Sequence, residues 1–126
     1  MNRENVYGKN VFITGASSGI GLACARMFAR HGCCVTGISR NTEETEEFFE
    51  GGGSISMRKL DVTDEEAVRS FVASLPAVDI AVLCAGMGVA GPAETTPSAM
   101  TRKQMEVNYF GTLNAAQPCL DRKSVV

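Results

Sequence analysis

The chain has 126 residues, of which 44% are apolar and 21% are charged, as expected for one globular domain with a modest core. Its formal net charge of −2 argues against nucleic acid or an anionic membrane as the main partner. No apolar run approaches the ~18 residues that a membrane span requires, and residues 1–5 lack the apolar core of a signal peptide. We therefore expect a cytoplasmic protein that binds neither nucleic acid nor membrane.

The first half of the chain alternates between the period of a strand and that of a helix. An apolar run that ends in glycines predicts a strand, and apolar residues at helical spacing predict a helix that Gly32 ends. After a second strand, Asn41 followed by Glu44 is typical of a helix cap and predicts a short acidic helix. The predicted elements are a strand at 11–14, a helix at 20–30, a strand at 33–38, an acidic helix at 44–50 and a glycine turn at 51–53.

The second half of the chain repeats this alternation. Thr63 and Glu66 form the pattern of a capping box, which opens a helix, and Pro97 occupies a favoured first position of another. The run 79–84 is nearly all apolar, as buried parallel strands are. The predicted elements are a strand at 55–60, a helix from 63 to 75, a strand at 79–84, a glycine-rich loop at 85–92 and a long helix from 97 to about 120.

The order of these elements predicts the fold class. Four strands alternate with helices as βαβαβαβα, which indicates an α/β protein with a parallel sheet and helices on both faces. Crossovers between parallel strands are right-handed, and the first half of a doubly wound sheet has a usual strand order. Together they predict a Rossmann-like, doubly wound sheet with strand order 3-2-1-4. We expect residues 1–120 to form one dinucleotide-binding domain.

The five cysteines predict no metal site and no redox pair. They contain no C-x-x-C pair, and four of them lie in apolar surroundings on predicted helices or strands. We expect buried, reduced thiols. The cysteines are Cys24, Cys33, Cys34, Cys84 and Cys119.

A glycine-rich turn between the first strand and the first helix predicts a site for a pyrophosphate. Such a ligand needs backbone N–H donors and the positive end of a helix dipole. Gly15 would make the tight turn, Gly19 would let the phosphates approach, and Gly21 would let the helix pack against the strand. Ser17 and Ser18 could add hydroxyl donors. The predicted ligand-binding residues of this turn are Gly15, Ser17, Ser18, Gly19, Ile20 and Gly21.

With this turn, the chain resembles the short-chain dehydrogenase/reductase family from Tyr7 to about Leu120. The family's T-G-x-x-x-G-x-G motif is matched at every fixed position by residues 14–21. Further family positions follow in order along the chain. The resemblance implies that Asp61 and Val62 contact the adenine of a nicotinamide cofactor, and that the segment Cys84, Ala85 and Gly86 lies near that cofactor.

One of these positions departs from the family. Cys84 stands where the family has an asparagine that steadies the sheet, and cysteine is the poorer hydrogen-bond former. We expect some loss of rigidity there, and no loss of cofactor binding.

The end of the second strand predicts NADP(H) rather than NAD(H). An NAD site places a carboxylate there for the ribose 2′-hydroxyl. This chain has Ser39 at that position, followed by Arg40. Arginine can pair with a 2′-phosphate through charge-assisted hydrogen bonds. The alternative is that Arg40 is a solvated surface residue.

The resemblance also implies catalytic groups that this chain lacks. The family uses a tyrosine with a lysine four residues later, a serine on the fifth strand, and an asparagine in the long helix that supports a proton relay. Only the asparagine is present, as Asn108, because neither Tyr7 nor Tyr109 has a lysine four residues on. We therefore expect the cofactor half of an NADP-dependent enzyme that acts on a carbonyl or alcohol, inactive as it stands.

Two other functions remain open at this point. The chain could be a non-catalytic NADP(H)-binding module or sensor, or a family member that keeps the fold as a scaffold after losing catalysis. The long helix resembles the family's subunit-contact helix, which implies a homo-oligomeric parent protein. If the truncation is real, we expect the fourth strand to present an open apolar edge to other chains.

The last six residues predict a non-native tail. Residues 121–126 can be back-translated as GAT CGG AAG AGC GTC GTG, and a following TAG would be a stop codon. That string resembles a common sequencing-adapter sequence read in frame. We expect the native chain to continue after about Leu120, and a genuine tail is the alternative.

Overall fold

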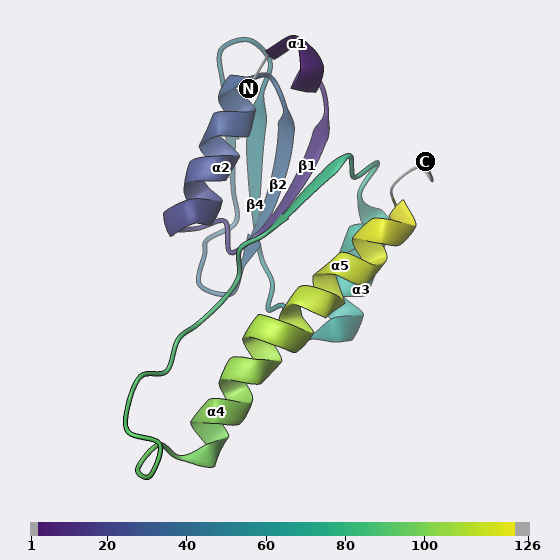
Figure 1. Cartoon of the computed structure of the whole chain (residues 1–126). Helices are drawn as coiled ribbons and strands as arrows, with labels where there is room; N and C mark the ends of the chain where they lie inside the picture. Colours follow the sequence, from purple (N-terminus) through teal and green to yellow (C-terminus); the bar gives the residue numbers. More distant parts are fainter. Residues whose placement is uncertain (1–2, 123–126) are drawn as a thin grey trace.

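A computed structural model describes residues 3–122 of the chain. A five-stranded sheet forms its centre, with strand order β3-β4-β2-β1-β5, and helices cover both faces (Figure 1). The elements, with their bounds, are α1 (Arg3–Val6), β1 (Asn10–Thr14), α2 (Gly19–Arg30), β2 (Cys34–Ser39), β3 (Thr45–Phe48), β4 (Ser54–Lys59), α3 (Glu65–Ser74), β5 (Ile80–Leu83), α4 (Ser98–Met105), η1 (Glu106–Phe110) and α5 (Gly111–Arg122).

The predicted α/β, Rossmann-like fold and the order of its four parallel strands are confirmed. The strands predicted first to fourth are β1, β2, β4 and β5, and they lie in the order β4-β2-β1-β5, which is 3-2-1-4. All pairings among them are parallel. Because the chain leaves β1 toward β2 but returns from β4 to the other side of β1, the direction of winding reverses between β1 and β5. Ligands of doubly wound sheets bind at such a reversal.

Alternation along the central strands divides the core into two layers. Val11 and Ile13 of β1 pack with α2, whereas Phe12 points to the opposite face with Ile38 of β2. That second layer is closed by α3 and α5, which lie together on one face of the sheet in Figure 1. Phe12 is 1% exposed, so both faces of β1 are withdrawn from water, as expected of a central parallel strand.

The acidic helix predicted at 44–50 is wrong. The segment forms β3, an antiparallel edge strand whose register pairs Thr45 with Met57 and Phe48 with Ser54 of β4. Two glycines with positive φ, Gly51 (94°) and Gly52 (98°), make the tight turn into β4 possible. Glutamates spaced three and four apart would also repel one another on a helix, whereas β4 offers this segment a free edge of hydrogen-bonding groups.

Three details of the helices also differ from the predictions. The cap of α3 is Asp64, whose carboxylate accepts a hydrogen bond from the Ala67 N–H at 3.1 Å, so the predicted capping box at Thr63 is wrong by one residue. The long helix runs from α4 through a π-helical turn, η1, into α5. Such turns are frequent at functional sites, and this one contains Asn108. The short helix α1 had no counterpart in the predictions.

The cysteines are all free thiols, but their burial is uneven. Cys33 and Cys119 are buried and Cys24 and Cys84 are half-buried, whereas Cys34 is exposed. The prediction of buried thiols is therefore wrong for Cys34, at the solvated start of β2. Burial raises the pKa of Cys119 to about 11, which keeps that thiol protonated.

The tail predicted at 121–126 lies mostly outside the described residues. Asp121 and Arg122 continue α5, and a guanidinium nitrogen of Arg122 donates a hydrogen bond to the Leu75 carbonyl. Residues 123–126 are not described, so the origin of the tail stays a prediction.

We predict that Gly111→Ala destabilises the fold. Alanine is favoured over glycine inside a helix by about 1 kcal/mol, but a Cβ on Gly111 would lie 2.7 Å from Cγ2 of Val62. Val62 is itself buried and cannot swing away, so overpacking outweighs propensity and lowers the free energy of unfolding by about 1–3 kcal/mol. Denaturant unfolding measures this. Gly88→Ala is the matched control, because no atom lies within 4 Å of its Cβ position. An unchanged or higher stability of Gly111→Ala would contradict the prediction.

Candidate functional site

A cleft of about 1100 Å³ opens at the carboxyl ends of the parallel strands. It lies where the winding of the sheet reverses, which is where ligands of such sheets bind. The structure brings all the cofactor-binding residues predicted from the sequence to its lining. They are Gly15, Ser17, Ser18, Gly19, Ile20, Gly21, Ser39, Arg40, Asp61, Val62, Cys84, Ala85 and Gly86.

Each of the three glycines at the start of α2 is required for a different geometric reason. A Cβ on Gly15 would lie 2.7 Å from the backbone nitrogen of Ala85, and one on Gly21 would lie 2.1 Å from the Gly15 carbonyl oxygen. Gly15 and Gly19 have positive φ, 65° and 55°. Nothing lies within 4 Å of the Cβ position of Gly19. The turn is thus packed tightly on its inner side and open toward the cleft at Gly19.

The N-terminus of α2 has the electrostatics of an anion site. Its cap residue Ser18 makes no side-chain capping hydrogen bond, and the first turn of the helix contains no acidic residue. The first N–H groups and the positive end of the helix dipole therefore face the cleft without a competing carboxylate. A cradle with glycine at each close approach and free N–H donors fits a pyrophosphate.

A hydrogen bond between two serines joins this turn to the end of β2. The hydroxyl oxygens of Ser17 and Ser39 lie 2.8 Å apart. Arg40 follows, and its guanidinium forms no hydrogen bond or ion pair with any other residue of the described range 3–122. The cleft therefore has an unpaired cation at this corner.

Asp61 gives the neighbouring wall a negative charge held in place by hydrogen bonds. The Thr63 N–H and hydroxyl both donate to its Oδ1 at 2.9 Å. The bond from the Thr63 backbone is the main cause that lowers the pKa of Asp61, and the charges of Arg40 and Lys103 lower it further. Asn114 of α5 donates to the Val62 carbonyl at 2.9 Å, which fixes this segment against the helix.

The segment after β5 is held by two hydrogen bonds to Thr14 of β1. The Thr14 carbonyl accepts from the Cys84 N–H, and the Thr14 hydroxyl accepts from the Ala85 N–H, both at 3.2 Å. Burial, followed by the nearby Cys24 thiol, raises the pKa of Cys84. These bonds join the end of β5 to β1, on which the glycine turn begins.

Asn108 lies beside the cleft and is not in its lining. Its Oδ1 accepts from the Met87 N–H at 2.8 Å, and its Nδ2 donates to the Met87 carbonyl at 2.7 Å. The neighbouring Val107 does line the cleft. Asn108 thus fixes the loop after β5 through both polar atoms, and its predicted part in a proton relay stays a prediction.

The sequence analysis missed several residues of the cleft. Those of the loop after β2 were missed because Asn41 was interpreted as the cap of a helix at 44–50; their position just beyond a parallel strand was the available signal. Met87 and Val107 neighbour predicted residues. The additional residues used below are Asn41, Thr42, Glu43, Thr45, Met87 and Val107. Glu43 is the second carboxylate of the cleft lining, in addition to Asp61.

The part of the chain that the structure describes contains neither a cluster of metal ligands nor a membrane-spanning helix. Residues 3–122 contain no group of three or more His, Cys, Asp or Glu side chains able to hold a metal ion. Nor does any helix within them combine the length and hydropathy needed to cross a membrane.

Comparison with known proteins points to one family. The sequence model of the family described as short chain dehydrogenase matches residues 9–124. Similar proteins include 3-ketodihydrosphingosine reductase of Bacteroides thetaiotaomicron, 32% identical over 114 residues (87% of this chain, 40% of the relative). Another is fatty acyl-CoA reductase of Acinetobacter baylyi, 35% identical over 121 residues (88% and 41%). A third is serine 3-dehydrogenase of Rhizobium radiobacter, 34% identical over 126 residues (92% and 51%).

Solved structures share the fold. Ligand-free aldohexose dehydrogenase of Thermoplasma acidophilum superposes with a TM-score of 0.82 at 24% identity, over 94% of this chain and 45% of that one. An NADH-dependent reductase, A1-R′, complexed with NAD gives 0.80 at 23% identity, over 96% and 54%. The chain spans about half the length of the relatives that it matches.

We predict that Asp61 contributes stability that is lost in acid. Its folded pKa lies below the ordinary value of 3.8, so the contribution is complete above that value and disappears as the pH falls through the lowered pKa. Asp61→Asn keeps an acceptor for Thr63 but removes the charge. Melting temperatures across a pH series should therefore differ most between the two proteins at neutral pH and converge in acid. A difference that stays constant with pH would contradict this.

Proposed function

The chain belongs to the short-chain dehydrogenase family, and from this membership we propose that it is the NADP(H)-binding part of an oxidoreductase of a carbonyl or alcohol substrate. The observation that carries the choice of cofactor is the unpaired guanidinium of Arg40 at the end of β2, where Ser39 replaces a carboxylate. The guanidinium could donate several hydrogen bonds to a 2′-phosphate there, and the end of β2 has no acidic side chain to repel that phosphate.

The other parts of the cleft support this assignment. The pyrophosphate would lie on the first N–H groups of α2, beside Gly19. Asp61 and Val62 would border the adenine, and the segment 84–86 would border the other half of the dinucleotide. A bound nicotinamide supplies hydride chemistry at its C4 atom. The residues of this chain bind the cofactor and orient it.

A second cofactor choice has one observation in its favour. Glu43 lines the same corner of the cleft as Arg40, and a carboxylate can accept hydrogen bonds from the ribose hydroxyls of NAD(H). Both side chains are exposed, but Glu43 follows the strand end by four residues whereas Arg40 follows it directly. We therefore favour NADP(H), and the experiment below decides between the two.

A second function is a dinucleotide-binding module without chemistry of its own. Neither Tyr7 nor Tyr109 of this chain is followed by a lysine four residues later. We propose that the chain by itself binds cofactor without turnover, and that Asn108 supports a proton relay in the whole protein.

The exposed face of the long helix supports a proposal about assembly. Large apolar side chains along α4, η1 and α5 are exposed to water, which is typical of contact surfaces. We propose that the parent protein is a homo-oligomer. These side chains are Met100, Met105, Tyr109, Phe110, Leu113 and Leu120.

We predict that the chain binds NADPH about tenfold more tightly than NADH or better, and that Arg40→Asp reverses the order, because the 2′-phosphate then meets a carboxylate. Isothermal titration with each cofactor measures both affinities. Arg69→Asp changes the net charge equally but lies on α3, outside the cleft lining, and should leave both affinities unchanged.

Equal affinities of the unmodified chain for the two cofactors would refute the NADP(H) assignment. Glu43→Gln then tests the other choice: a selective loss of NADH affinity would assign the ribose contact to Glu43. Binding of neither cofactor would contradict both assignments.

A further inference from the structure

The loop between β2 and β3 forms one wall of the cleft and has little structure of its own. Residues 40–43 line the cleft, and so does Thr45, the first residue of β3. Within 41–44 the one side-chain hydrogen bond runs from the Thr42 hydroxyl to the neighbouring Glu43 carbonyl, at 3.1 Å. The conformation of this wall therefore depends on what holds its two ends.

The near end of the loop is tied to the sheet. The Ser39 carbonyl accepts a hydrogen bond from the Leu60 N–H at 3.1 Å, and the Ser39 hydroxyl contacts that of Ser17 at 2.8 Å. Arg40 follows directly. The start of the loop is thus fixed both to β4 and to the glycine turn.

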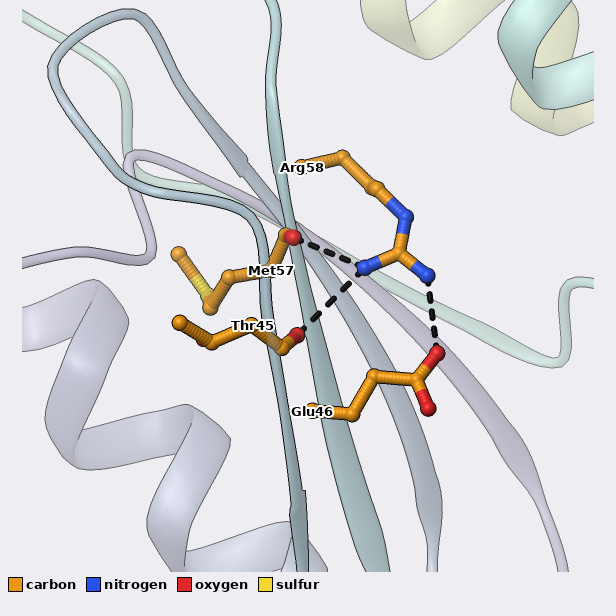
Figure 2. Close-up of polar contacts among 4 residues, drawn as sticks. All are labelled: Thr45, Glu46, Met57 and Arg58. Atoms are coloured by element: carbon orange, nitrogen blue, oxygen red, sulfur yellow. Dashed lines mark hydrogen bonds and ion pairs between the residues drawn. The ribbon is translucent and has the colours of Figure 1, made fainter.

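The far end of the loop enters the ladder between β3 and β4, and one arginine, shown in Figure 2, holds it in addition. Nη1 of Arg58 donates to the carbonyl oxygen of Thr45 at 3.3 Å and to that of Met57 at 2.9 Å. Nη2 of Arg58 donates to Oε1 of Glu46 at 2.9 Å. One rigid guanidinium therefore joins the first two residues of β3 to β4, and a fork of fixed geometry suits this task better than a single ammonium.

The register of the sheet places this clamp at the edge that carries the cleft. Arg58 is paired with Ile38 of β2, one residue before Ser39, and Thr45 is paired with Met57. Arg58 thus lies at the level where the loop leaves β2 and enters β3. The ion pair itself is partly solvated, with side-chain exposures of 31% for Arg58 and 53% for Glu46, and such pairs add little to stability.

We propose that Arg58 is a positioning residue for cofactor selection, which fixes β3 and the loop so that Arg40 is presented to the 2′-phosphate. This inference rests on the proposed NADP(H) function. A wall that is already ordered loses less conformational entropy on binding. The affinity therefore rises for the ligand that contacts this wall. NADPH has the 2′-phosphate that Arg40 would bind, whereas NADH lacks it.

The test compares Arg58→Met and Arg58→Lys with the matched control Arg69→Met, which removes a different surface ion pair, Arg69–Glu65 at 3.1 Å on α3. By titration, NADPH affinity should fall about tenfold in both Arg58 variants and NADH affinity should stay within about twofold, because only the loop is loosened. Arg69→Met should change neither. Lysine keeps the charge but cannot span the three acceptors.

Two results of the titration would overturn the proposal. An equal loss of affinity for both cofactors would indicate a general structural role. NADPH affinity of Arg58→Lys equal to that of the unmodified chain would indicate that the charge acts from a distance and the clamp does not matter.

Hydrogen–deuterium exchange of the cofactor-free chain separates this inference from the proposed function. Amides of residues 40–48 should exchange faster in both Arg58 variants and not in Arg69→Met. Unchanged exchange would overturn the clamp whatever the cofactor. Suppose that exchange rises in the Arg58 variants but the unmodified chain binds NADPH and NADH equally. The NADP(H) function and the role of Arg58 in selection are then both refuted. The conclusion that Arg58 holds the loop is retained.

Discussion

The close packing of the glycine turn against the end of β5 is the constraint on which the cleft depends. The backbone of Gly15 approaches that of Ala85 so closely that a Cβ would lie 2.7 Å from its nitrogen, and Gly21 has even less room beside the Gly15 carbonyl. This contact sets where α2 begins relative to β1 and β5. The first N–H groups of the helix therefore open onto the point where the sheet reverses its winding, with the positive end of the helix dipole directed into the cleft.

Around this fixed centre, the flanking walls are built from loops held by side chains. Asn108 holds the loop after β5 through both backbone groups of Met87, and Arg58 holds the loop after β2 through the carbonyl of Thr45. In each case a polar side chain on a helix or strand hydrogen-bonds backbone groups at the end of a loop. The helices and strands make the site rigid, and the loops between them provide the contacts, as is common in binding sites.

The sequence predicted the parts of the site that depend on local rules. Glycine spacing between a strand and a helix identified residues 15–21, and the position at the end of the second strand identified Ser39. Asp61 and Cys84 were identified through the resemblance to the family. These residues share one cleft because the carboxyl ends of parallel strands meet at one edge. The conformation of the loop after β2 was not predicted, because Asn41 and Glu44 have the pattern of a helix cap. No local rule reveals that β4 has a free edge.

The sequence by itself therefore determined the order of the elements, the parallel sheet and the glycine cradle, since periodicity and glycine conformation act within a few residues along the chain. Only the tertiary structure decided that an acidic segment becomes β3, and that Arg58 and Asn108 hold the walls of the cleft. Those outcomes depend on pairing between segments that are distant in sequence, such as Asn108 with Met87, 21 residues away. Such pairings are selected by the free energy of the whole fold.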